Sequence, residues 1–324
     1  MSVSNIKHDG DIVWEYKPRF RLYKDGSYER NDFPDVPPSL DDPITGVSSK
    51  DITISKEISA RLYLPKLNSP NQKLPILVYI HGGAFCFETA FEAYYHDYMN
   101  ALVKEANVVV VSVEYRLAPE HPLPAAYEDS WNALQWVASH SDNEAKIEKE
   151  PWLINHGDFD KFFINGDSAG ANIVNNMVMR AGTEKLHGDV IIAGAILAFP
   201  YFWGSKPIGS MSSESNMQSL SYKIWEFVYP LAPGGIDCAL INPIADGAPS
   251  LAQIRCSKML VVTGELDEVR ERGIQYVEAV KKSEWKGEIE LVDVEGEDHC
   301  FQMEHLQSEK ARDLIKRLAY FINK

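Results

Sequence analysis

One serine stands in a pattern that would make it a nucleophile. An apolar run, 162–165, leads into Gly166-Asp167-Ser168-Ala169-Gly170, and the next residues favour a helix over 169–181. A serine at such a strand-to-helix turn exposes its hydroxyl, because the flanking glycines keep neighbouring backbone from colliding. The helix N-terminus there favours negative charge that develops on a substrate. The pattern predicts nucleophilic chemistry at Ser168; the structural alternative is a plain glycine-rich turn.

A serine hydroxyl needs a base, and neutral imidazole suits that task because its pKa lies near working pH. His299 lies in the loop after the last expected strand, whereas most other histidines lie on polar segments away from strand ends. A carboxylate should orient the imidazole. Asp267, in the loop after the strand 258–263, is the first choice for that role, and Glu265 and Glu268 remain alternatives.

Glycines after an earlier strand could supply the second half of an oxyanion site. The run 76–80 is followed by His81-Gly82-Gly83-Ala84. Main-chain N–H groups of Gly83, together with Gly82 or Ala84, and the N–H of Ala169 are the expected donors, each worth roughly 3 kcal/mol in such sites. We expect His81 to orient this loop through a hydrogen bond and not to act as a base.

The elements that must position these residues alternate along the chain. About eight strands are expected, at 51–55, 60–64, 76–81, 108–115, 161–165, 190–199, 259–263 and 288–294. Helices are expected at 91–105, 125–139, 169–181, 270–282 and 308–322. Alternation of this kind predicts an α/β fold with a mostly parallel sheet and helices on both faces. Active sites in such sheets lie beyond the carboxyl ends of the strands.

Two segments do not follow the alternation, namely residues 1–50 and about 203–247, which are rich in Pro, Gly, Ser and aromatic residues. We interpret them as a cap over the carboxyl edge of the sheet, within a single domain over 1–324. The alternative is that they are irregular surface connections.

Composition restricts the partners. The 324 residues include 32 Lys and Arg against 47 Asp and Glu, a net charge of -15. No run of Lys or Arg interrupts that acidity, so we expect neither nucleic acid nor an anionic membrane as a partner. The four cysteines are far apart and form no zinc-like cluster, so no metal is expected. We expect no cofactor either. The N-terminus lacks an apolar signal and no apolar run is long enough for a bilayer, which predicts a cytoplasmic protein.

The chain resembles the plant carboxylesterases of the hormone-sensitive-lipase-like α/β-hydrolase family. The blocks that carry this resemblance span nearly the whole length and include YKDGSYER, ARLYLPK, HGGAFC, EYRLAPEHPLPAAYED, GDSAGAN and EGEDHCFQ. The order Ser168, Asp267, His299 along the chain is also the order of that fold. FWGSKPIGS and APGGID are most similar to the 2-hydroxyisoflavanone dehydratase branch, and YEDSWNALQWVASH is similar to alkaloid cyclases of the family.

Three departures matter for what the resemblance implies. Dehydratases of that branch carry threonine where Ser168 stands, which favours ester hydrolysis here. The cyclases lack the catalytic Asp and His that are present as Asp267 and His299, and their loop reads H-G-A-G. The receptors of the family, which bind without turnover, lack the histidine. The resemblance also implies that Tyr115 and Arg116 brace the oxyanion loop.

These observations favour a serine carboxylesterase acting on small-molecule esters. A dehydratase or cyclase of plant specialised metabolism using the same pocket is one alternative, and a non-catalytic small-molecule receptor is another. The expected partner is a small-molecule ester or related plant metabolite, and a homodimer stays open. Five aromatic residues near the motif loops are candidates for the substrate pocket, with ordinary core positions as the alternative: Phe85, Tyr201, Trp203, Trp225 and Phe301.

Overall fold

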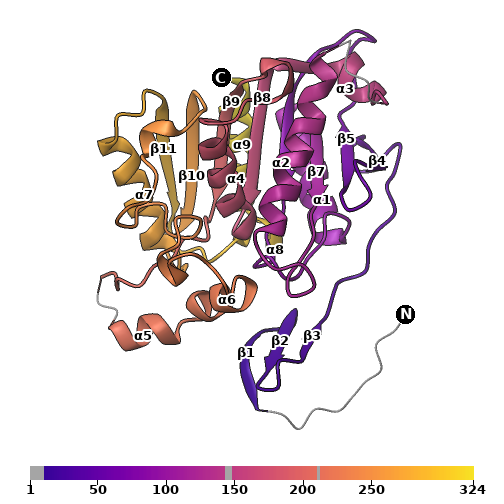
Figure 1. The fold of residues 1–324 in the computed structure, drawn as a ribbon. Helices are drawn as coiled ribbons and strands as arrows, with labels where there is room; N and C mark the ends of the chain where they lie inside the picture. The colour runs from indigo at the N-terminus through magenta and orange to yellow at the C-terminus, as the bar shows by residue number, and fades with distance from the viewer. Residues whose placement is uncertain (1–10, 143–147, 210–211) are drawn as a thin grey trace.

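An eight-stranded sheet forms the centre of the protein in a computed structural model that describes residues 11–142, 148–209 and 212–324. Its strand order is β11-β10-β9-β8-β6-β7-β5-β4, and the strands from β6 to β11 run parallel. β5 is antiparallel to β7 and β4 is antiparallel to β5. A separate antiparallel sheet, β1-β2-β3, comes from the N-terminal segment (Figure 1).

The strands have the following bounds: β1 Ile12–Tyr16, β2 Phe20–Tyr23, β3 Tyr28–Arg30, β4 Ser48–Thr53, β5 Ser59–Leu64, β6 Leu74–Ile80, β7 Val109–Glu114, β8 Gly157–Asp167, β9 Ile192–Ala198, β10 Lys258–Gly264 and β11 Glu288–Val294. The α-helices have these: α1 Ala93–Ala106, α2 Ala125–Ala138, α3 Pro151–His156, α4 Ala169–Arg180, α5 Ser213–Gln218, α6 Leu220–Val228, α7 Arg270–Lys282, α8 Phe301–Glu304 and α9 Glu309–Asn323.

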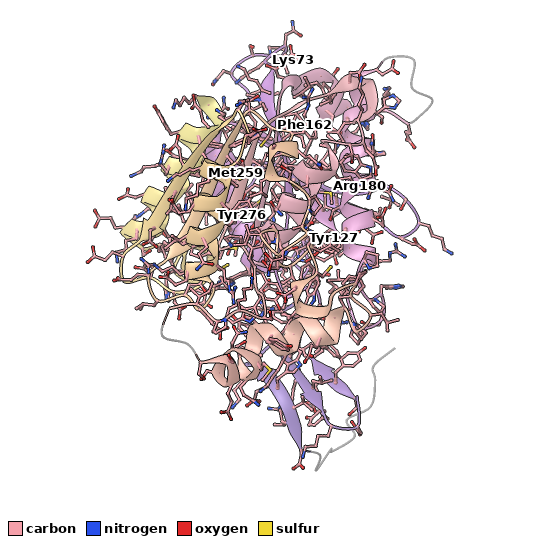
Figure 2. All side chains as sticks on the ribbon, turned by 60° about the vertical axis from the view of Figure 1, so that its left-hand side comes forward. Lys73, Tyr127, Phe162, Arg180, Met259 and Tyr276 are labelled. Atoms are coloured by element: carbon pink, nitrogen blue, oxygen red, sulfur yellow. The ribbon has the colours of Figure 1, made fainter. Side chains whose placement is uncertain are left out.

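Helices cover the large sheet on both faces, which is why its inner strands are apolar along their whole length. All seven residues of β6, LPILVYI, are buried. One hydrophobic cluster joins the sheet to α2, α4 and α7, and a second joins the opposite face to α1 and α9. Figure 2 shows two residues of the first cluster in the sheet, Phe162 and Met259, with Tyr127 and Tyr276 on the helices beside them.

The last helix shows how sequence sets this packing. The Ser308 side chain caps α9 by accepting a hydrogen bond from the Ala311 N–H at 3.1 Å. The apolar residues of α9 recur every three or four positions, so they form one stripe that faces the sheet. The predicted stripe is buried in the structure: Leu314, Ile315, Leu318, Phe321 and Ile322.

The predicted fold class, an α/β fold with a mostly parallel sheet of eight strands, is confirmed. The five predicted helices are present with boundaries shifted by at most two residues, as in Ala93–Ala106 for the predicted 91–105. The sequence reading missed β1 to β3 and the short helices α3, α5, α6 and α8. These elements are three to nine residues long, too short for a hydrophobic period to show.

Parts of the two segments expected to form a cap lie at one edge of the large sheet, whereas residues 48–50 of the first segment belong to β4 of that sheet. Figure 1 shows β1 to β3 together with α5 and α6 below the sheet, near α8. Tyr16 of β1 and Ile224 of α6 line the same cavity at that edge. Residues 1–10 and 210–211 of these segments lie outside the described residues. That the segments act as a cap stays a prediction.

No helix in the described part of the chain has the length and apolar character needed to cross a membrane. Within those same ranges, no group of three or more His, Cys, Asp or Glu side chains is arranged to hold a metal ion.

Candidate active site

Ser168 lies at the sharp turn between β8 and α4. Its backbone has φ 51° and ψ -114°, a conformation that L residues rarely adopt. Both neighbouring glycines are required by close backbone contacts. A Cβ on Gly170 would lie 2.0 Å from the carbonyl oxygen of Ile80, and a Cβ on Gly166 would lie 2.5 Å from the carbonyl carbon of Gly170. The turn therefore presses against the end of β6 and holds the serine out of the helix.

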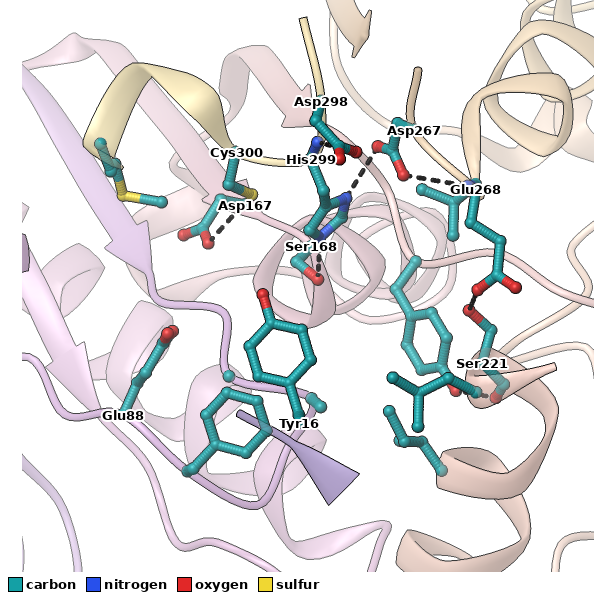
Figure 3. A pocket seen from close by; sticks show the side chains of 18 of the residues that line it. Tyr16, Glu88, Asp167, Ser168, Ser221, Asp267, Glu268, Asp298, His299 and Cys300 are labelled. Carbon is teal, nitrogen blue, oxygen red and sulfur yellow. Dashed lines mark hydrogen bonds and ion pairs between the residues drawn. The ribbon is translucent and has the colours of Figure 1, made fainter. Parts of the chain in front are cut away.

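The structure brings Ser168, His299 and Asp267 into one hydrogen-bonded chain (Figure 3). His299 Nε2 lies 2.8 Å from Ser168 Oγ, and His299 Nδ1 lies 2.7 Å from Asp267 Oδ2. Asp267 Oδ1 accepts the Val269 N–H at 3.0 Å, which fixes the carboxylate. These residues follow the carboxyl ends of β8, β10 and β11, three strands that run parallel and therefore end at the same edge.

The charges around His299 suit a base. Burial lowers the pKa of the imidazole, but the carboxylates of Asp267, Asp167 and Asp298 together raise it by more, so its pKa lies above the ordinary value of 6.5. A carboxylate on Nδ1 stabilises the imidazolium that forms when Nε2 takes a proton. The ring of Phe199 packs edge-on against His299, with the ring centroids 5.8 Å apart. The imidazole is thus held in both orientation and place.

Only the tertiary structure distinguishes Asp267 from the two other candidate carboxylates. Glu265 accepts the N–H of Gly296 at 2.7 Å, and Glu268 accepts the hydroxyl of Ser221 at 2.8 Å. Asp267 alone of the three contacts the imidazole. The side chain of Asp267 is 2% exposed, so its pairing with His299 is shielded from solvent.

The glycine loop after β6 lies beside Ser168. Its N–H groups differ in whether they have a partner, which the sequence did not predict. Gly83 and Ala84 line the cavity together with Ser168, and none of the N–H groups of Gly83, Ala84 and Ala169 has a partner among the described residues. The Gly82 N–H instead donates to the Tyr95 hydroxyl at 2.9 Å. Gly82 is therefore wrong as a candidate oxyanion donor, because its hydrogen is already used. The available donors are Gly83, Ala84 and Ala169.

Buried aromatic residues hold this loop from below. His81 stacks on Tyr115 with centroids 4.2 Å apart, and its Nδ1 lies 3.2 Å from the carbonyl oxygen of Gly82. Burial lowers the pKa of His81 to about 3, so its ring is neutral. The Tyr115 hydroxyl bonds to the carbonyl oxygens of both His81 and Gly82, at 2.9 and 2.7 Å. The resemblance also implied that Arg116 braces the loop, but its guanidinium pairs with Asp129 of α2.

A cavity of about 280 Å³ opens above these groups. One wall comes from the C-terminal loops and α6, and the other from β1, the glycine loop and α8. The lining has both apolar and acidic side chains, including Tyr16, Phe87, Glu88, Tyr94, Tyr201, Ile224, Glu268, Met303 and Glu304. A molecule in this space would contact Ser168, His299 and the loop N–H donors together.

Of the five aromatic residues expected in the pocket, only Tyr201 belongs to the cavity lining. Phe85, which is fully buried, packs against Tyr201 and Trp225 behind the wall. The Arg272 guanidinium covers the ring of Trp203 at 5.1 Å. Phe301 packs on Phe199, which in turn supports His299. The assignment of Phe85, Trp203, Trp225 and Phe301 to the substrate pocket is therefore wrong, because apolar rings near a site are buried in the core beneath it.

Sequence reasoning missed several cavity residues. Tyr16 comes from an N-terminal strand that has no motif, and Tyr94 lies in a helix among other aromatic residues. Glu88 did carry a signal: it is an acidic residue five positions after Gly83, in a loop that must turn back toward the serine.

This chain is similar in sequence to one family model and to several plant enzymes, and similar in structure to a solved esterase. The family model of the alpha/beta hydrolase fold matches residues 77–303. A 2-hydroxyisoflavanone dehydratase of Glycyrrhiza echinata is 57% identical over 318 residues, covering 96% of both chains. A catharanthine synthase of Catharanthus roseus is 46% identical over 334 residues, covering 99% of both. A hyperthermophilic esterase of Pyrobaculum calidifontis matches with a TM-score of 0.67 and 28% identity, over 85% of this chain and 84% of that one.

The resemblance predicted from the sequence blocks is confirmed by these relatives. The matched region covers more than half of the chain and contains the serine, the carboxylate, the histidine and the glycine loop. This protein therefore belongs to the alpha/beta hydrolase family.

Proposed function

We propose that this protein is a serine carboxylesterase that hydrolyses small-molecule carboxylic esters. His299 takes the proton of Ser168, and Oγ attacks the ester carbonyl. The N–H groups of Ala169 and of Gly83 or Ala84 stabilise the oxyanion. His299 then gives its proton to the departing alcohol, leaving an acyl-serine. Water, deprotonated by His299, attacks this ester, and the acid leaves as the proton returns to Ser168.

One observation carries the proposal: the unbroken chain from Ser168 Oγ through His299 to Asp267, with contacts of 2.8 and 2.7 Å. A nucleophile, its base and the group that orients the base are all within hydrogen-bond reach, which is the geometry that acyl transfer requires. The chain faces a cavity of about 280 Å³, which suits a small substrate.

Replacing the nucleophile tests the proposal. We expect Ser168→Ala to reduce kcat for p-nitrophenyl acetate by about 10⁶-fold, as in other serine hydrolases that lose this oxygen. Ser257→Ala, at an exposed serine outside the cavity, is the matched control and should retain wild-type turnover. Undiminished turnover by Ser168→Ala would end the proposal.

A second candidate is the elimination of water from a hydroxy ketone, which the 57% identity to a dehydratase favours. In that reaction His299 removes a carbon-bound proton while the loop N–H groups hold the carbonyl oxygen. His299 then gives this proton to the departing hydroxyl, which leaves as water. Ser168 forms no bond to the substrate there. Product analysis separates the two: elimination releases water without any acid, and Ser168→Ala retains it.

The third hypothesis is a receptor that binds a small molecule without turning it over. A fluorophosphonate probe reacts with a serine only when a base activates it. We expect mass spectrometry to find the label on Ser168 in the wild-type chain, and a chain that binds small molecules but stays unlabelled would support a receptor.

A further inference from the structure

A second chain of polar groups, separate from the one through His299, lies under the glycine loop. Glu88 Oε2 lies 2.6 Å from the Tyr95 hydroxyl, and that hydroxyl lies 3.1 Å from Asp167 Oδ2. The same hydroxyl accepts the Gly82 N–H at 2.9 Å. Tyr79 donates to Asp167 Oδ1 at 2.6 Å. Asp167 is 2% exposed, and the side chain of Glu88 is 12% exposed where it borders the cavity.

Counting the hydrogens that these contacts need argues for an extra proton in this chain. The Tyr95 hydroxyl has one hydrogen but contacts two carboxyl groups, so two ionised carboxylates would leave one close oxygen pair without a hydrogen. Every contact is satisfied if Glu88 is protonated and donates to Tyr95 while Tyr95 donates to Asp167. The contacts are satisfied equally if Asp167 is protonated and donates to Tyr95 while Tyr95 donates to Glu88. One proton is therefore shared between Glu88 and Asp167.

The groups around Glu88 place that proton mainly on Glu88. Arg19, before β2, is the cation that faces it, at 3.8 Å from Oε1, but Arg19 lies closer to Glu92, at 2.7 Å. Tyr16, Tyr94, Cys300 and Glu304 line the same cavity as Glu88. Burial raises the pKa of Glu88 to about 8, and Asp167 adds to it. Burial also raises the pKa of Asp167 to about 6, against the two tyrosine hydrogen bonds.

This chain is packed against both halves of the reacting site. A Cβ on Gly82 would lie 2.4 Å from Asp167 Oδ2, and a Cβ on Gly83 would lie 2.9 Å from Cβ of Glu88. Asp167 directly precedes Ser168 in the chain. A change in charge between Glu88 and Asp167 therefore acts on the loop that carries the Gly83 and Ala84 donors and on the turn that carries the nucleophile.

We propose that Glu88 is a positioning residue whose proton, shared with Asp167 through the Tyr95 hydroxyl, holds the glycine loop in its oxyanion-binding arrangement. This proposal rests on the proposed esterase function. When Glu88 loses the proton, two negative charges face one hydroxyl that can serve only one of them, and a new negative charge lies beside the place where the oxyanion forms. Both effects oppose the reaction, so activity falls as Glu88 ionises.

The pH dependence of Glu88→Gln tests this, because glutamine resembles the protonated acid but cannot ionise. For a neutral acetate ester, we expect kcat/KM of the wild type to fall on the alkaline side near the pKa of about 8 that Glu88 has in the fold. Glu88→Gln should stay within about tenfold of wild type at neutral pH and lose that alkaline fall. Glu88→Ala should lose about 10²-fold in kcat at neutral pH, because the loop is no longer held.

Glu304→Gln is the matched control, since Glu304 borders the same cavity but takes no part in the chain of contacts. It should keep the wild-type alkaline fall. An alkaline fall that persists unchanged in Glu88→Gln overturns the proposal. So does a Glu88→Gln protein that melts like wild type and yet is as inactive as Glu88→Ala.

A stability measurement tests the shared proton without any substrate. Glu88 has a raised pKa in the fold, so the folded state binds more protons than the unfolded state between the ordinary value of 4.5 and about 8. The unfolding free energy of wild type should therefore fall relative to that of Glu88→Gln as pH rises through this range. A pH-independent difference overturns the shared proton even in an active enzyme. A falling difference in a chain that hydrolyses no ester instead refutes the esterase function.

Discussion

At the scale of single residues, the chemistry depends on which of several neighbouring residues of the same type contacts the partner group. Three acidic side chains lie within four positions of the loop after β10, and only Asp267 reaches the histidine. Two adjacent glycines lie in the loop after β6. Gly82 donates its N–H to Tyr95, whereas the N–H of Gly83 has no partner in the part of the chain that the structure describes. Neighbouring residues of one type thus have different roles, which follow from contacts with distant parts of the chain.

The Asp267 carboxylate should set the acid side of the pH profile. His299 must be neutral to accept the serine proton, and its pKa is raised above 6.5, so kcat/KM should fall as pH drops through a midpoint above that value. In Asp267→Asn this raising interaction is lost, so the histidine pKa should fall, and kcat should drop by about 10⁴-fold. A pH profile of wild type and an NMR titration of the His299 ring in the variant measure the two effects.

Glu265→Gln serves as the control for this prediction, because Glu265 lies in the same loop and bonds to the Gly296 N–H instead. Glu265→Gln should leave the acid-side midpoint of the pH profile unchanged. A histidine pKa that is the same in Asp267→Asn and in wild type would contradict the assigned role of the carboxylate.

At the scale of elements, the turn between β8 and α4 is held by contact between backbones. Gly170 lies against the end of β6, so the strand that precedes the glycine loop also fixes the turn that carries Ser168. The pattern G-x-S-x-G with a preceding apolar run was sufficient to predict this local structure. The short helices α5 and α6 were not predicted, because their positions depend on what they cover.

Gly170→Ala should destabilise the fold markedly. Its Cβ would lie 2.0 Å from the carbonyl oxygen of Ile80, a backbone atom that cannot rotate away. We expect a loss of about 2–3 kcal/mol in the free energy of unfolding. Gly26→Ala is the comparison. Its φ of +82° is unfavourable for alanine, but among the described residues no heavy atom beyond its two chain neighbours lies within 4 Å of the added Cβ, so about 1 kcal/mol is expected. Urea denaturation of both variants measures the difference, and equal losses would show that the contact with β6 is not what requires Gly170.

At the scale of the whole molecule, an acidic protein surrounds an acidic cavity. The chain has a net charge of -15. Six of the described residues that line the cavity carry carboxyl groups, and none of the lining residues in the described ranges is a lysine or arginine. We expect a negative potential inside such a cleft, which would repel anions and attract cations.

Esters with an additional negative charge should therefore be poor substrates. We expect kcat/KM for a monosuccinate ester to be lower by about tenfold or more than for the matching neutral butyrate ester of the same alcohol. Added salt should raise the rate for the charged ester by screening the repulsion and leave the neutral ester nearly unchanged. Steady-state kinetics at two ionic strengths measure this. Equal kcat/KM values at low salt would show that the cavity does not discriminate by charge.

The sequence by itself determined the fold class, the eight strands of the main sheet and the identities of Ser168, Asp267 and His299 as candidates. These depend on local patterns: apolar periodicity, a glycine-bounded turn, and polar residues at strand ends. The tertiary structure decided which aromatic residues line the cavity and which N–H groups are free. It also brought Tyr16 to the site and joined Glu88 to Asp167. Those features come from contacts between segments far apart in the chain, for which a single sequence carries no local signal.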